Sequence, residues 1–314
     1  MSKISPKFLE KANKIADKYQ TIIDASSSEI PNFSHEVDDE KFQIFIITDA
    51  HIGSKEADLK LLKNYIKKIE KTPNAVVIVL GDLLDMALKN SKSDIYDAAI
   101  SPSDQVMTAI SLLHPIKDKI AVVTRGNHEY RSDKETDLNP LLPMNLALGL
   151  EDKYAKDSFS LVIENDKGEK FNIFGSHGSG LGGRKETRII NSAVNVSNNS
   201  LGNFDLYVFG HKHISAGFEQ EVSVLNEDGT ISKKIKRIYI EPAFLKKGGY
   251  GEMYNFKTPP TQHHFFEVEF KNGMPLFTVH DFVPSYQRNV SKKSAYKKAL
   301  EEKNKKQNII KGGR

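Results

Sequence analysis

An unbroken apolar run, AVVIVL at residues 75–80, organises the first half of the chain. It shows no alternation with polar residues, which predicts a strand buried on both faces, as in a parallel sheet. The run ends at Gly81, and Asp82 follows directly. Open α/β sheets build their sites at the carboxyl ends of their strands, so Asp82 is the first candidate functional residue.

Two similar runs, at residues 42–48 and 120–124, predict two more buried strands. Apolar residues recur at helical spacing over 57–71 and about 103–113, which predicts amphipathic helices between the strands. Such a β-α-β pattern is typical of a parallel sheet with right-handed crossovers. Polar residues follow each strand: Asp49 and His51, then Asp82 and Asp85, then Arg125, Asn127, His128 and Glu129.

After residue 150 the pattern changes to strands joined by short turns. Strands are expected at residues 159–163, 171–174 and 205–209, and strands dominate from there to residue 282. A glycine-rich loop at residues 180–184 precedes an expected helix that ends near residue 197. Histidines again follow strand ends: His177 after the second strand, and His211 and His213 after the third.

The ends of the chain differ in character from this central part. Residues 5–24 predict an amphipathic helix, and residues 25–40 are Ser-rich and acidic, which indicates a linker. We therefore expect a helix and linker at 1–40, a main domain at 41–284 and a basic tail at 285–314. The tail holds ten Lys or Arg against two Glu, which gives it a net charge of +8. Because the whole chain carries +4, the remainder is net negative, at −4.

Composition excludes several classes of site. The chain has no cysteine, which rules out disulfides, thiolate metal sites and a cysteine nucleophile. A bound metal must be held by His, Asp, Glu, Asn or backbone groups, and this favours Mn, Fe, Zn or Mg. No apolar run approaches the roughly 18 residues of a membrane span, and no apolar signal segment is visible at the N-terminus. We expect a cytoplasmic protein without a membrane association.

The polar residues at the strand ends have the chemistry of metal ligands. In an extended chain, side chains two residues apart point the same way, so Asp49 with His51, and His211 with His213, would each present two ligands to one cavity. Asp82 lies between these pairs and offers two oxygens, which would let it bridge two ions. The candidate ligands are Asp49, His51, Asp82, Asn127, His177, His211 and His213.

Five motifs in this order resemble the calcineurin-like metallophosphoesterases, and in particular their compact phage and bacterial members. They are D-x-H at 49–51, G-D-x-x-D at 81–85, G-N-H-E at 126–129, G-x-H at 175–177 and G-H-x-H at 210–213. The resemblance implies an α/β fold, a four-layer β-sandwich of two mixed sheets flanked by helices. It also implies a dinuclear metal centre at the strand ends.

The resemblance further implies a role for each residue. Asp49, His51, Asp82 and His213 would hold one divalent ion, and Asp82, Asn127, His177 and His211 the other, with Mn²⁺ the leading candidate. Two such metal ions generate a hydroxide from bound water at neutral pH, and this hydroxide would attack phosphorus directly. His128 would be the general acid, and the Asp85 carboxylate would orient it. Asn127 and Arg184 are candidate substrate-binding residues, although a glycine-rich loop such as 180–184 is also typical of a flexible turn.

The sequence favours a phosphodiesterase acting on nucleic acid or a nucleotide. Phosphoprotein phosphatases of this superfamily carry an arginine after the second Asp of the G-D-x-x-D motif, where this chain has Met86. The basic tail at 285–314 is a candidate nucleic-acid arm, or else a solvated lysine-rich end. The alternatives are a phosphomonoesterase acting on a nucleotide, sugar or protein, and a non-enzymatic scaffold that retains the fold.

Overall fold

The computed structural model describes residues 10, 13–17, 30–88, 98–182, 185–199, 203–225, 228–246 and 262–284. The chain divides into two units, Met1–Pro31 and Asn32–Arg314. In the first unit, residues 10 and 13–17 are helical, within the helix predicted at 5–24. The remainder of that predicted helix lies outside the described residues. All that follows concerns the second unit.

One six-stranded sheet has the order β12-β11-β2-β3-β4-β5. Its strands are β2 (Lys41–Ile47), β3 (Ala75–Leu80), β4 (Ile120–Thr124), β5 (Tyr154–Ala155), β11 (His263–Lys271) and β12 (Met274–Phe282). Strands β2 to β5 are parallel, whereas β11 and β12 pair antiparallel, so the sheet is mixed. The strands predicted at 42–48, 75–80 and 120–124 are confirmed.

The second six-stranded sheet has the order β1-β6-β7-β8-β10-β9 and is also mixed. Its strands are β1 (Asn32–Val37), β6 (Ser158–Asn165), β7 (Lys170–Ser176), β8 (Leu206–Phe209), β9 (Ala216–Leu225) and β10 (Ile231–Ile240). The prediction that residues 25–40 form a linker is wrong for β1, which pairs parallel with β6. Only Val37 of β1 is buried, so its sequence, NFSHEV, shows too weak an apolar pattern to indicate a strand.

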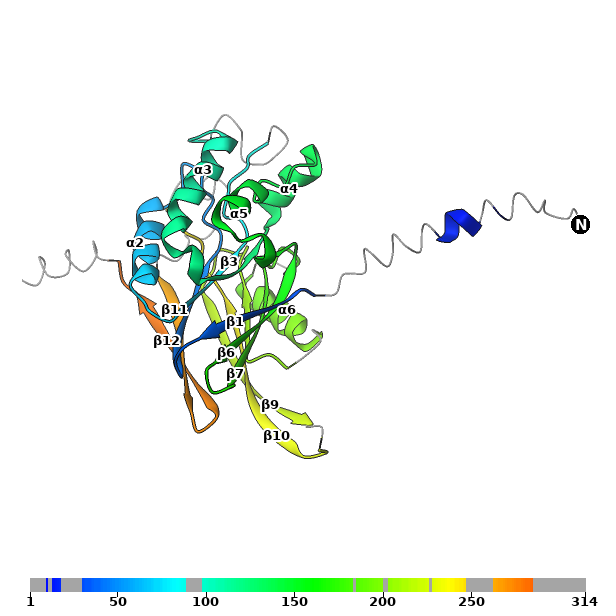
Figure 1. The fold of residues 1–314 in the computed structure, drawn as a ribbon, viewed down its shortest axis with the longest axis vertical. Helices are drawn as coiled ribbons and strands as arrows, with labels where there is room; N and C mark the ends of the chain where they lie inside the picture. The colour runs from blue at the N-terminus through cyan, green and yellow to red at the C-terminus, as the bar shows by residue number, and fades with distance from the viewer. Residues whose placement is uncertain are drawn as a thin grey trace, which may run out of the picture. The chain divides into compact units, whose positions relative to one another are not determined.

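Helices cover the outer faces of the two sheets (Figure 1). They are α2 (Leu59–Glu70), α3 (Pro102–Leu113), α4 (Asn127–Thr136), α5 (Leu142–Leu148) and α6 (Glu186–Asn199), with short 3₁₀ turns at His114–Lys119 and Glu151–Lys153. The Asp58 side chain caps α2 by accepting from the Leu61 N–H at 3.0 Å. Among the described helices, none is long and apolar enough to cross a membrane.

The alternation of side chains along β3 connects two hydrophobic cores. Ala75, Val77 and Val79 face the core shared with α2, α3 and α5. The intervening residues, Val76, Ile78 and Leu80, face the core between the two sheets. Because both faces of β3 are buried, its unbroken apolar sequence is explained. The layers confirm the predicted architecture of two mixed sheets flanked by helices.

The carboxyl ends of β2, β3 and β4 in one sheet and of β7 and β8 in the other meet at one edge, where Nδ1 of His177 lies 2.8 Å from the Leu80 carbonyl. Backbone hydrogen bonds join the ends of β2 and β3, from the Asp49 N–H to the Gly81 carbonyl at 3.1 Å. The ends of β7 and β8 are joined in the same way, from the Gly210 N–H to the His177 carbonyl at 3.1 Å. Parallel strands deliver their following residues to a common edge, and here two sheets do so together.

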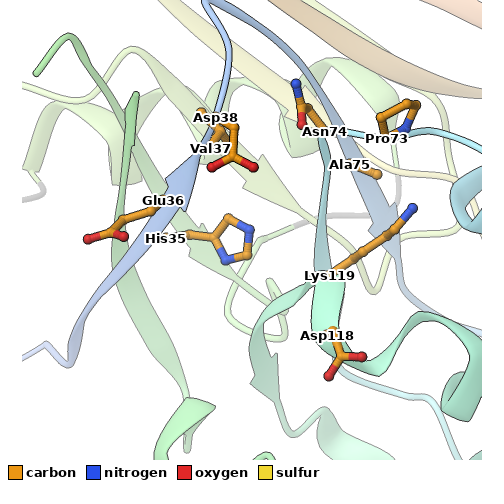
Figure 2. A pocket seen from close by; sticks show the side chains of 9 residues that line it. All are labelled: His35, Glu36, Val37, Asp38, Pro73, Asn74, Ala75, Asp118 and Lys119. Atoms are coloured by element: carbon orange, nitrogen blue, oxygen red, sulfur yellow. The ribbon is translucent and has the colours of Figure 1, made fainter. Parts of the chain in front are cut away.

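A polar cavity of about 150 Å³ lies at the amino ends of β3 and β4, beside β1 (Figure 2). His35, Asn74 and Lys119 are among the residues that line it. The Lys119 ammonium is already used, since it donates to the carbonyls of Ile69 and Glu70 at 3.0 Å. None of the candidate metal ligands lines this cavity.

Candidate metal centre

The first group of candidate ligands is Asp49, His51 and His213, whose donor atoms converge. The Nε2 of His213 lies 3.1 Å from Oδ1 of Asp49 and 3.3 Å from Nε2 of His51. Asp49 is fully buried, and its other oxygen, Oδ2, accepts from the His211 N–H at 2.8 Å. One carboxylate oxygen is therefore held by the backbone while the other faces the two imidazoles.

The second group is Asp82, His177 and His211, with Asn127 beside it. The Nε2 of His177 lies 3.2 Å from Oδ2 of Asp82 and 3.2 Å from Oδ1 of Asn127. Oδ1 of Asp82 accepts from the His128 N–H at 2.8 Å. Asp82 thus repeats the arrangement of Asp49, with one oxygen bound to the backbone and one exposed to the site.

The two groups form a single site, because Nε2 of His177 is also 4.0 Å from Oδ1 of Asp49. The structure brings all seven sequence-predicted ligands together. Neither Asp49 nor Asp82 has a Lys or Arg ion-pair partner within the part of the chain that the structure describes. Fully buried carboxylates require a compensating positive charge. This donor set of carboxylate, imidazole and amide groups fits two divalent cations.

The backbone at the site is strained rather than extended, which corrects the expectation that Asp49/His51 and His211/His213 lie in extended segments. Five of the seven candidate ligands have left-handed φ angles: Asp49 (50°), His51 (43°), Asp82 (48°), His211 (66°) and His213 (52°). Each such residue costs on the order of 1–3 kcal/mol, and such residues cluster at functional sites. The side chains converge because of these turns, not because of strand periodicity.

Two glycines allow the ends of β3 and β4 to approach. Gly81 has φ of 76°, and a Cβ at this position would lie 2.7 Å from both the Gly126 nitrogen and Nδ1 of His177. A Cβ at Gly126 would collide with the Asp82 carboxylate and nitrogen. A larger residue at Gly126 would displace Asp82, and one at Gly81 would push against His177 and the backbone of Gly126.

Glu129 supports the site without joining it. Its side chain is fully buried and accepts three backbone N–H groups, from Gly126 at 2.8 Å, Leu84 at 2.8 Å and Asp82 at 3.0 Å. Burial raises the pKa of Glu129, and the charge of Asp82 raises it further. Glu129 therefore fixes the left-handed Asp82 against the start of α4. Although the motif at 126–129 contains Glu129, the sequence alone indicated no role for it.

His128 lies beside the candidate metal ligands and contacts Asp85. Its Nδ1 lies 2.6 Å from the backbone carbonyl of Asp85 and 3.5 Å from Oδ1 of the same residue. The closer partner is thus the carbonyl, whereas the sequence predicted the carboxylate. Nε2 of His128 faces the site, 3.9 Å from Oδ2 of Asp82. Burial opposes protonation, but Asp82 and Asp85 raise the pKa of His128.

Arg131 is a site residue that sequence reasoning missed. It lies on α4, one turn after His128, and its Nη2 is 2.6 Å from Nδ1 of His128 and 3.2 Å from the Asp85 carbonyl. Because the polar sequence of α4 was not expected to be helical, the i, i+3 relation between His128 and Arg131 was not visible. Arg184, the predicted phosphate ligand, and the basic tail at 285–314 lie outside the described residues.

The pKa values show how strongly the ligands interact. Burial alone would lower the pKa of His177, yet Asp82 and Asp49 raise it to about 10. Burial, together with the nearby His177, lowers the pKa of His211 to about 4. The pKa of Asp82 is well below its usual range because His177 and His128 overcome the effect of burial. In the metal-free protein, protons on histidine therefore supply the charge that the carboxylates require.

Comparison with known protein families gives a match over the residues that hold the candidate ligands. The family model described as calcineurin-like phosphoesterase matches residues 42–215. No curated protein sequence matches the chain. Among solved structures, Vacuolar Protein Sorting 29 from Cryptosporidium parvum aligns with TM-score 0.36 and 12% identity, over 77% of this chain and 98% of that one. A Vps29 double mutant from Entamoeba histolytica aligns with TM-score 0.37 and 11% identity, over 77% and 100%.

We expect Glu129→Gln to weaken Mn²⁺ binding by roughly 10- to 100-fold, the range typical of residues that position metal ligands. Glutamine would present an N–H₂ group to backbone donors that now share a carboxylate, so Asp82 would lose its support. Isothermal titration with Mn²⁺ measures the effect. Glu135→Gln, an exposed position on the same helix, is the matched control. Equal affinities for the two variants would contradict the role of Glu129.

We also expect Mn²⁺ affinity to rise with pH. The pKa of His177 is raised to about 10, so this histidine holds a proton at neutral pH that must leave before the nitrogen can bind a metal. As pH increases, less work is needed to remove that proton, and metal binding strengthens. Calorimetry between about pH 6 and pH 8, in buffers of different ionisation enthalpy, should detect released protons. An affinity that does not change with pH would show that no ligand exchanges a proton for the metal.

Proposed function

The chain belongs to the calcineurin-like phosphoesterase family, and from this premise we propose that it is a dinuclear-metal-dependent phosphodiesterase whose substrate is nucleic acid or a nucleotide. One observation carries the proposal: the seven candidate ligands converge on one site, and two of them are buried carboxylates without Lys or Arg partners in the described residues. A scaffold protein has no need to maintain this costly arrangement.

The donor positions suggest how two ions would be held. Asp49, His51 and His213 would bind one ion, and Asn127, His177 and His211 the other. Asp82 would contribute to both; its Oδ1 accepts the His128 N–H, and its Oδ2 faces the other ligands. When bound, divalent cations such as Mn²⁺ would lower the pKa of water and neutralise charge on a phosphoryl group. The protein contributes the fixed position of each donor.

We assign the proton donor role to His128. Its Nδ1 is anchored 2.6 Å from the Asp85 carbonyl, so the ring is oriented and Nε2 faces the ligands. In hydrolysis the leaving oxygen of the ester would take the Nε2 proton as the P–O bond breaks, and the resulting neutral imidazole would keep its proton on Nδ1. The raised pKa of His128 is consistent with a proton held near neutral pH.

The substrate class is inferred from what surrounds the ligands. Met86 is buried, and its side chain belongs to the core beneath α2 and α3, so the position after Asp85 supplies no positive charge. A phosphodiester carries one negative charge, whereas a monoester dianion carries two. A diester therefore needs fewer cationic side chains for binding. The basic sequence at 285–314 further supports a polyanionic substrate such as nucleic acid.

We expect the Mn²⁺-loaded protein to hydrolyse bis-p-nitrophenyl phosphate, and Asp82→Asn to abolish the activity. Asparagine at this position removes the charge and one of the oxygens on which both ligand groups depend. Asp152→Asn, at an exposed position, is the control and should retain activity. The panel should include p-nitrophenyl phosphate, single- and double-stranded DNA, RNA and cyclic nucleotides. Hydrolysis of monoesters alone would reject the proposed substrate class.

His128→Asn should retain Mn²⁺ and lower turnover by roughly 10²- to 10⁴-fold, the range of general acid catalysis. The loss should be smaller for esters with good leaving groups, since these depart without a proton. A series of aryl diesters with leaving groups of different pKa measures this dependence. If good and poor leaving groups lose the same factor, His128 is not the acid.

A further inference from the structure

Arg131 is a cation at the site for which the mechanism above has no use. It projects from α4 one turn beyond His128, and its two hydrogen bonds in the described residues both use Nη2. One partner is the backbone carbonyl of Asp85, and the other is Nδ1 of His128; neither is a carboxylate. A guanidinium has five N–H donors, so most of its hydrogen-bonding capacity is not accounted for by these contacts.

Arg131 also lacks an ion pair within the part of the chain that is described. Its Nε is buried and has no hydrogen-bond partner there. Arg125, at the end of β4, is different: its Nη1 lies 2.6 Å from Oδ2 of Asp133, and its guanidinium lies over the Tyr130 ring. Arginine side chains placed for stability usually have such partners, whereas Arg131, although it lies near the charges of Asp85 and Asp82, forms no ion pair with another described residue.

Arg131 and the Asp85 carbonyl compete for a hydrogen bond with Nδ1 of His128. The Asp85 carbonyl and Nη2 of Arg131 both lie 2.6 Å from Nδ1 of His128. An imidazole nitrogen either donates to a carbonyl or accepts from a guanidinium, and it cannot do both. When Nδ1 donates to the Asp85 carbonyl, the acceptor that Arg131 keeps among the described residues is that same carbonyl, 3.2 Å from Nη2, and its other N–H donors are left over.

We propose that the remaining N–H donors of Arg131 bind the substrate, at the non-bridging oxygens of its phosphoryl group. This inference rests on the proposed function, because it takes the reacting ester to lie beside His128. The planar guanidinium donates two parallel N–H groups, which match two oxygens of one phosphoryl group. Arg131 is thus a substrate-binding residue supplied by α4, at a site where Met86 faces the core.

The test measures binding of inorganic phosphate to Mn²⁺-loaded protein by calorimetry, which requires no turnover. Arg131→Gln should weaken phosphate binding by roughly 10- to 100-fold, as expected for loss of charge-assisted hydrogen bonds, with Mn²⁺ stoichiometry unchanged. Arg131→Lys should restore part of the affinity, because lysine keeps the charge but not the planar fork. Arg188→Gln, which removes an exposed arginine on α6, should bind phosphate as the wild type does.

Three results would overturn the inference. In the first, Arg131→Gln and Arg131→Lys both bind phosphate as the wild type does. In the second, Arg131→Gln loses Mn²⁺, which would show that Arg131 supports the metal ligands. In the third, Lys212→Gln, which removes the half-buried lysine between His211 and His213, would weaken phosphate binding while Arg131→Gln does not. Failure of the proposed function is recognised separately, by a wild-type protein that hydrolyses no diester. With an active wild type, KM for bis-p-nitrophenyl phosphate should rise in Arg131→Gln in parallel with the loss of phosphate affinity.

Discussion

Two buried carboxylates, Asp49 and Asp82, impose the main physical constraint on this structure. They are 0% and 1% exposed, and within the described residues their charged neighbours are histidines rather than lysine or arginine. Burial of uncompensated charge is among the largest penalties a fold can carry. Protons on histidine offset part of it in the metal-free state, and divalent ions would offset more. Metal binding and fold stability are therefore linked at this edge of the sheets.

The rest of the site holds each carboxylate in its buried position despite the cost of burying its charge. Backbone N–H groups of His211 and His128 hold one oxygen of Asp49 and Asp82 respectively, at 2.8 Å in each case. Glu129 then holds the backbone of Asp82 itself. These bonds and the two hydrophobic cores offset the strain of five left-handed ligand residues. The ligands consequently need little rearrangement to receive ions, which is the physical basis of preorganisation.

The polar residues beside the ligands form a second layer with a different task. His128, Asp85 and Arg131 share one set of hydrogen bonds around Nδ1 of His128. Two of the three come from the start of α4, so the helix that supplies Asn127 also presents the proton donor and the guanidinium. A single short helix therefore couples the ligand group of Asp82 to the groups that would contact an ester.

The sequence by itself determined the parts that depend on local pattern. Apolar runs identified β2, β3 and β4 because both faces of these strands are buried, and the ligands were found because they directly follow strand ends. Tertiary structure decided what local pattern does not encode. Strand β1 exists through its pairing with β6, and α4, with sequence NHEYRSDKET, is held by Glu129 and buried Ser132 rather than by an apolar stripe. The contacts of His177, His211 and His213 with Asp49 and Asp82 follow from two sheets meeting at one edge. His128 and Arg131 reach the Asp85 carbonyl because β3 and β4 are neighbours in one sheet, which places the start of α4 beside the segment after β3.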